Sequence, residues 1–210
     1  IGFVGSALLV VSVLLPSPKP TEPRGIYDRT TRGMRIYLAT PRLRGLLSLN
    51  FAAAAAGAMV LVNTVVLVRS DLGLGDFHVA IALGAFGGGS MLAALVLPKL
   101  LDNRPDRPVM ICGALVLVTA LLALSLMALV YETHWIPLLA GWFIIGIGYS
   151  VVLTPSGRLL KRSAHAEDRP AVYAAQFALS HACWLVTYPL AGWLITVSGP
   201  TVAFAALALL

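Results

Sequence analysis

Long apolar runs alternate with short polar stretches along most of this chain, a pattern typical of helices that cross a membrane. Five runs are complete, and a sixth begins at residue 200. At a rise of about 1.5 Å per residue, a run of 23 residues forms a helix about 34 Å long, enough for a hydrocarbon core about 30 Å thick. The predicted spans are residues 46–68, 77–97, 109–130, 136–154, 171–197 and 200–210.

The polar connections between these runs are short. Because short connections make consecutive helices antiparallel neighbours, the pattern predicts an all-α membrane protein, built as a six-helix transmembrane bundle. The predicted connections are residues 69–76, 98–108, 131–135, 155–170 and 198–199.

The segment before the first complete span divides into two parts. Residues 1–15 are apolar but short, and we expect them to be the end of a transmembrane helix. Residues 16–45 are basic, and the four prolines between residues 16 and 23 favour an extended start. After Gly25, the pattern fits either a short amphipathic helix on the membrane surface or a basic loop. Because Ile1 is not a Met and both ends are apolar, we expect a piece cut from a longer membrane protein.

Composition agrees with a membrane protein. The chain is 59% hydrophobic and 11% charged, whereas soluble domains are about 45–50% apolar and about 25% charged. This balance excludes a disordered chain and argues against a soluble enzyme. The net charge of +6 does not indicate nucleic-acid binding, because the basic residues lie in separate stretches between the apolar runs.

The basic residues predict the orientation of the bundle. Seven of the 15 precede the first complete span, three lie in residues 98–108 and four in residues 155–170. These stretches fall on one side of the predicted bundle, and Arg69 alone falls on the other. By the positive-inside rule, the Arg- and Lys-rich loops are cytoplasmic, and the protein is a multi-pass protein of the cytoplasmic (inner) membrane.

Residues 98–108, which read Pro-Lys-Leu-Leu-Asp-Asn-Arg-Pro-Asp-Arg-Pro, carry a family signature. They resemble the loop signature G-x-L-x-D-R-x-G-R-R of the major facilitator superfamily, which follows the second helix of each six-helix half. Prolines replace both of its glycines. The matching positions are Leu100, Asp102 and Arg107, with Arg104 near a basic position.

Two further stretches resemble motifs of the same family. Gly146-x-Gly148 resembles the end of R-x-x-x-G-x-G, with Trp142 at the position of the Arg. Residues 188–193, which include Pro189 and Gly192, partly resemble the helix-kink motif G-P-x-x-G-G of the family's antiporters. The resemblance implies that residues 16–45 are the central loop and residues 46–210 the C-terminal half, with the last helix truncated. It further implies two three-helix inverted repeats and a substrate site near the midplane between the halves.

The resemblance implies a secondary active transporter, not an enzyme, that moves a small molecule by alternating access through proton-coupled efflux. It implies that contacts of Asp102, Arg104 and Arg107 hold the outward-facing state and break during rocking. The expected partners are the lipid bilayer, the substrate, the proton and the N-terminal half of the same protein, and no cofactor is expected. An importer, a membrane-embedded enzyme and a structural membrane protein stay open as alternatives.

The span centres carry no Asp, Glu, Lys or Arg, so a coupling carboxylate is expected in the other half. His181 could exchange protons or pack as a neutral residue between helices. Asn63 could line a cavity or bond to a neighbouring helix. Aromatic residues could line a cavity for an amphipathic substrate or face lipid. The candidate contacts are His181, Asn63, Gln176, Tyr149 and Trp142, with Trp184 and Phe177 as further aromatic candidates.

The sequence offers little support for metal or enzyme chemistry. The four histidines are scattered and have no metal-ligand spacing, so no metal site is predicted. Ser180 and His181 are adjacent and would point to different faces of a helix, and no Asp supports them.

Overall fold

Long apolar helices make up most of the protein in its computed structural model, which describes residues 2–13, 26–131 and 133–210. Residues 1–30 and 31–210 form separate compact units. In the first unit, helix α1 covers Gly2–Ser12, inside the apolar segment at the start of the chain. The proline-rich stretch that the sequence predicts to be extended lies outside the described residues.

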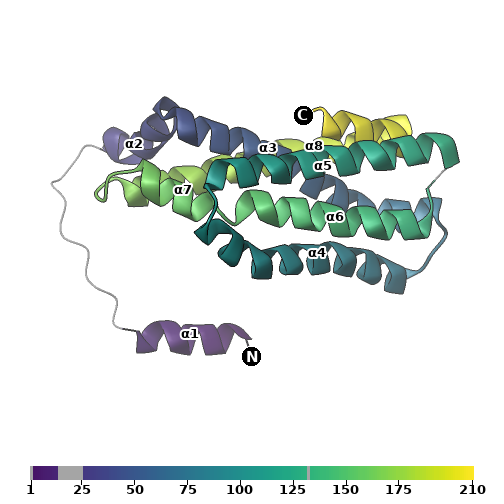
Figure 1. The fold of residues 1–210 in the computed structure, drawn as a ribbon, viewed down its shortest axis with the longest axis horizontal. Coiled ribbons are helices and arrows are strands. Elements are labelled where there is room, and N and C mark those ends of the chain that lie inside the picture. Colours follow the sequence, from purple (N-terminus) through teal and green to yellow (C-terminus); the bar gives the residue numbers. More distant parts are fainter. Residues whose placement is uncertain (1, 14–25, 132) are drawn as a thin grey trace. The chain divides into compact units, whose positions relative to one another are not determined.

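Within the described residues, five helices are long and apolar enough to cross a membrane (Figure 1). They cover the predicted spans, the last helix taking in both 171–197 and most of 200–210, and the arrangement as two three-helix inverted repeats stays a prediction. After α1, the elements are α2 (Ile26–Ala39), α3 (Pro41–Val66), the π-helical turn η1 (Leu67–Asp71), α4 (Asp76–Asp102), α5 (Asp106–Tyr131), α6 (Trp135–Leu153), α7 (Ser156–Ser163) and α8 (Arg169–Ala208).

Helix α8 contains the predicted boundary between the fifth and sixth spans. Its backbone leaves the helical conformation at Gly199, where φ is 76° and ψ is 175°. Glycine adopts this positive φ without the steric cost that a Cβ would add. The predicted connection at residues 198–199 is therefore confirmed as a break between two helical segments.

Two predicted connections contain more helix than the pattern indicates. Helix α4 continues to Asp102, through the start of the predicted connection 98–108. Its last turn is held by Leu101, which is 4% exposed and packs in a cluster with Leu97 and Val109. Helix α7 lies within the predicted connection 155–170, and it buries Leu159 and Leu160. In both places, apolar side chains that reach a core stabilise helix beyond the apolar runs.

Helix α3 is the innermost element of the second unit. Every residue from 53 to 60 is buried, and α3 packs against α8, α6, α5 and α4. This buried stretch includes four consecutive alanines followed by Gly57. Such small side chains let neighbouring helices approach closely, and in a membrane close packing is a main source of helix association.

Helices α4 and α6 approach each other through glycines. A Cβ added to Gly89 would lie 2.0 Å from the carbonyl oxygen of Phe143, and one added to Gly146 would lie 2.1 Å from that of Phe86. Real Cβ atoms do not come this close to backbone. The two backbones are therefore in contact at positions that only glycine can occupy without a shift.

Candidate functional site

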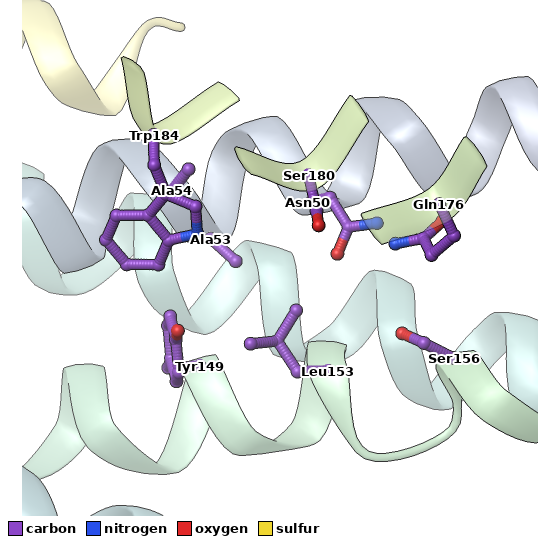
Figure 2. A pocket seen from close by; sticks show the side chains of 9 residues that line it. All are labelled: Asn50, Ala53, Ala54, Tyr149, Leu153, Ser156, Gln176, Ser180 and Trp184. Atoms are coloured by element: carbon purple, nitrogen blue, oxygen red, sulfur yellow. The ribbon is translucent and has the colours of Figure 1, made fainter. Parts of the chain in front are cut away.

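A cavity of about 160 Å³ lies between α3, α6 and α8, next to the start of α7 (Figure 2). The residues that line it are Asn50, Ala53 and Ala54 of α3, Tyr149 and Leu153 of α6, Ser156 of α7, and Gln176, Ser180 and Trp184 of α8. None of these nine described side chains is charged, and six of them carry polar atoms. The cavity is therefore neutral, with polar groups set in a mostly apolar lining.

Asn50 is the most deeply buried polar residue of the cavity. It is only 4% exposed, and its Nδ2 makes no hydrogen bond with any described group. A buried polar group that lacks a partner costs about 1–3 kcal/mol. Figure 2 shows the Asn50 amide among the cavity residues, so an unused donor faces this space.

Gln176 connects the cavity to α2. The phenolic hydroxyl of Tyr37, a fully buried residue of α2, donates a hydrogen bond to Gln176 Oε1. Burial raises the pKa of the Tyr37 phenol above its ordinary value, so the phenol stays protonated and remains a donor. This hydrogen bond orients the Gln176 amide, and Figure 2 shows the amide nitrogen directed toward Asn50.

The C-terminal part of α2 is held against the start of α8. Arg32 Nε lies 2.7 Å from Asp168 Oδ1. A Cβ added to Gly33 would lie 2.0 Å from the carbonyl oxygen of Ala171, so the two backbones touch there. Together with the Tyr37–Gln176 hydrogen bond, these contacts dock residues 31–39 onto the helix that carries three cavity residues.

Aromatic side chains form one wall of the cavity. The ring centroids of Trp184 and Tyr149 are 6.1 Å apart in an edge-on arrangement, and Tyr149 meets Phe86 at 5.5 Å. Tyr188 adds a further ring 4.8 Å from Trp184. A Cβ on Gly57 would lie 2.6 Å from the Trp184 ring, so glycine at this position leaves room for the indole.

The structure brings together two of the five candidate contacts, Tyr149 and Gln176. Asn63 lies instead in the core, where Nδ2 donates to the carbonyl oxygen of Ala191 at 3.0 Å. Trp142 is fully buried, and its Nε1 donates to Thr64 Oγ1 at 2.8 Å. Asn63 and Trp142 thus join neighbouring helices, which for Asn63 is one of the two alternatives that the sequence leaves open.

His181 lies outside the cavity lining. It is exposed, its ring packs on Phe177 with centroids 4.0 Å apart, and its Nδ1 lies 2.7 Å from the Phe177 carbonyl oxygen. Among the cavity residues that sequence reasoning missed, Asn50 is the buried polar one. The available signal was an amide side chain inside an apolar run, close to the start of the first complete span.

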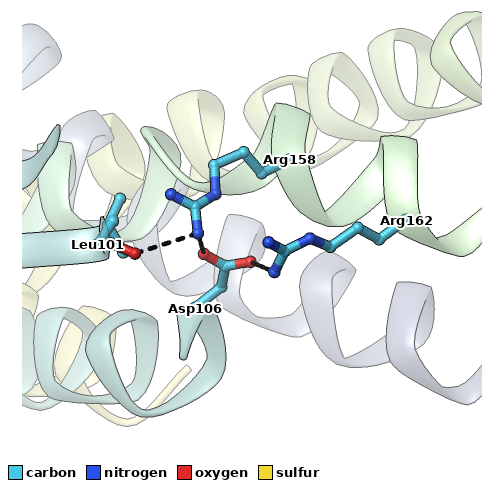
Figure 3. A network of polar contacts seen from close by, with 4 residues as sticks. All are labelled: Leu101, Asp106, Arg158 and Arg162. Atoms are coloured by element: carbon cyan, nitrogen blue, oxygen red, sulfur yellow. Dashed lines mark hydrogen bonds and ion pairs between the residues drawn. The ribbon is translucent and has the colours of Figure 1, made fainter. Parts of the chain in front are cut away.

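An ion-pair network lies at the same end of the bundle as α7 (Figure 3). Asp106, at the start of α5, has a side chain that is 5% exposed, with Arg158 Nη2 at 3.0 Å and Arg162 Nη1 at 3.1 Å. Arg158 also donates to the carbonyl oxygen of Leu101 at 3.2 Å. One carboxylate and two guanidinium groups therefore tie α7 to the junction between α4 and α5.

The residues of the loop signature lie beside this network. Asp102, Arg104 and Arg107 are all exposed. Asp102 has no ion pair or side-chain hydrogen bond with any residue that the structure describes. In α8, the helix runs through Pro189 and Gly192, and the residue with non-helical backbone angles is Gly199.

Long apolar helices that pack through small residues and enclose a neutral polar cavity define an integral membrane protein of the polytopic helical class. Comparison with known protein families matches residues 46–210 to the Major Facilitator Superfamily, and the chain belongs to this family. Membership implies a secondary transporter in the lipid bilayer with a small-molecule substrate, and members are typically not enzymes. A search of curated proteins finds no match to the chain.

Proposed function

We propose that this protein moves a small molecule across the cytoplasmic membrane by alternating access, as a proton-coupled efflux transporter. The observation that carries the proposal is the neutral cavity with the buried, unused amide donor of Asn50, in a chain that belongs to a family of secondary transporters. A transporter needs internal polar groups that a solute can satisfy and then release. Most buried polar groups in folded proteins are hydrogen-bonded, so an unpaired donor that lines a cavity supports a site that a solute can satisfy.

The orientation that we propose places the α7 end of the bundle in the cytoplasm. The contacts of Asp106 with Arg158 and Arg162 bring two of the three basic stretches together at that end. At the other end, Arg69 forms an exposed ion pair with Asp76 at 3.3 Å. The positive-inside rule then assigns the Arg-rich end to the cytoplasm.

The proposed gate is the exposed loop signature. Asp102, Arg104 and Arg107 are free to contact another part of the transporter in one of its states, because all three are exposed. We expect Asp102→Asn to lower transport and to leave membrane insertion intact. Normal transport rates in Asp102→Asn, at matched amounts of protein in the membrane, would remove the gate from the mechanism.

Efflux coupled to protons is supported by residues 188–193, which partly resemble the kink motif of the family's antiporters. Pro189 leaves a carbonyl of α8 without its helical donor, and such sites are points at which a membrane helix can bend. We expect Pro189→Ala to slow transport more than it lowers stability.

Everted membrane vesicles that contain the full-length protein test direction and coupling together. Respiration acidifies the vesicle interior, so a proton-coupled exporter should accumulate its substrate inside, and an ionophore that collapses the pH gradient should abolish accumulation. The probes are a panel of radiolabelled uncharged and cationic small molecules, with vesicles that lack the protein as the control. Loss of solute from preloaded vesicles would indicate an importer, and no movement dependent on the protein would favour the enzyme or structural alternatives.

A further inference from the structure

The cavity presents hydrogen-bond donors to whatever occupies it. Asn50 Nδ2 has no partner, and Gln176 offers its amide nitrogen because its oxygen accepts from Tyr37. In Figure 2 the nitrogen ends of both amides face the space between them. Of these two donors, Asn50 Nδ2 is buried and left without an acceptor. An oxygen atom placed between them, from a carbonyl, ether or hydroxyl group, would satisfy both.

The charge of the occupant follows from the lining. No described side chain that lines the cavity carries a charge. An ion that enters this cavity gives up part of its hydration and finds no countercharge in the lining, whereas a neutral polar group that finds its hydrogen bonds is tolerated. The lining therefore selects an uncharged group over a carboxylate or an ammonium.

The volume of the cavity and its aromatic wall indicate the size and the apolar character of the bound group. The cavity volume of about 160 Å³ is close to the roughly 150 Å³ of an apolar protein cavity known to bind benzene. Drug-sized ligands need larger pockets, about 300–1,000 Å³. Trp184 and Tyr149 supply flat apolar surface against which a ring can pack.

We infer that this cavity binds one uncharged, ring-sized group, which presents an oxygen acceptor to Asn50 and Gln176 and an apolar face to Trp184. If the proposed transport function is correct, this group is part of the transported molecule. The transported molecule is then neutral and amphipathic at the end that enters this cavity.

Three probes of similar size test the inference on the full-length protein in lipid nanodiscs at pH 7. Benzamide is neutral and carries an acceptor oxygen, benzoate is an anion, and benzylamine is a cation. Saturation-transfer NMR titrations, with the signal of empty nanodiscs subtracted, give the affinity of each. We expect benzamide to bind at least about 10-fold more tightly than either ion, because neither ion finds a countercharge.

Two variants of α3 assign the binding to Asn50. Asn50→Leu should weaken benzamide binding about 10-fold, because it removes a hydrogen-bond donor at nearly constant volume. Ser48→Ala, at an exposed position two residues away, should leave binding unchanged. The comparison among the three probes uses the unaltered protein and so does not depend on whether Asn50→Leu folds.

Each outcome bears on the inference. Equal affinity for benzoate and benzamide, no binding of any probe, or unchanged benzamide affinity in folded Asn50→Leu would overturn it. Because binding is measured without a gradient, selective benzamide binding in a protein that transports nothing would keep the site and refute the proposed function. Transport by a protein that does not bind benzamide would refute the inferred binding site and leave the proposed transport function standing.

Discussion

Replacement of Gly89 by alanine should force α4 and α6 apart. The added Cβ would lie 2.0 Å from the carbonyl oxygen of Phe143. To reach ordinary contact at 3.4 Å, the two backbones must separate by about 1.4 Å at this point. The obstacle is backbone of a packed helix, so no side chain can rotate away to make room. Gly84, on the same helix, has no atom within 4 Å of its added Cβ and provides the matched control.

The magnitude follows from two opposing terms. Overpacking of a well-packed site costs about 1–3 kcal/mol, and rigid backbone on both sides places Gly89→Ala at the upper end. Alanine is the better helix former by about 1 kcal/mol, so the net loss of stability is about 2 kcal/mol. For a protein of this size, such a loss corresponds to a fall in Tm of about 4–8 °C. Gly84→Ala gains the higher helix propensity of alanine without the cost of overpacking. Its Tm should therefore match or slightly exceed that of the unaltered protein.

Thermal melts monitored by fluorescence size-exclusion chromatography measure both variants in the same detergent. If Gly89→Ala melts at the same temperature as Gly84→Ala, the helices do not meet as closely as the contact requires, and the reasoning is refuted. A double variant sharpens the test. Gly146→Ala opens the same interface, where its Cβ would lie 2.1 Å from the Phe86 carbonyl oxygen. Combined with Gly89→Ala, it should therefore cost less than the sum of the single variants.

Two further predictions concern the α7 end of the bundle. Asp106→Asn should lower stability by about 1–3 kcal/mol, seen as a fall in Tm, because it removes the ion pair with Arg158 and weakens the charge-assisted hydrogen bond from Arg162. A Tm equal to that of the exposed Asp102→Asn would contradict this. Tyr37→Phe should lower hydrogen-exchange protection of residues 31–39 by about fivefold to 10-fold, because the hydrogen bond to Gln176 is lost. Tyr173→Phe, which removes an exposed hydroxyl, should not change it.

The long helices could be predicted from the sequence because bilayer thickness sets the length of an apolar run that spans it. The break at Gly199 could be predicted because its polar connection is visible even between two apolar runs. The last turn of α4 and the whole of α7 could not, because they lie in polar sequence. Their helical state depends on tertiary contacts, such as the burial of Leu101 and Leu159, that hydropathy does not record.

The cavity was predictable in part. Tyr149 and Gln176 follow from polar and aromatic chemistry inside apolar runs. Trp142 has the same chemistry but packs in the core, because Thr64 offers an acceptor for its indole nitrogen. Which of two similar residues finds a partner inside the bundle is decided by helix packing. For the same reason, the unused donor of Asn50 becomes visible only when its neighbours are in place.

The two carboxylates at the turn between α4 and α5 illustrate how position changes the role of one residue type. Asp106 begins α5, where the helix dipole favours a negative charge, and two arginines neutralise it. Asp102 ends α4, where the dipole disfavours a negative charge, and it has no partner among the described residues. Asp106 is already paired with two arginines and stabilises the bundle in this state. Asp102 gains most from a new contact, so a partner present in one state of the transporter would bias the equilibrium toward that state. The exposed carboxylate without a protein partner is therefore the one suited to the proposed gate.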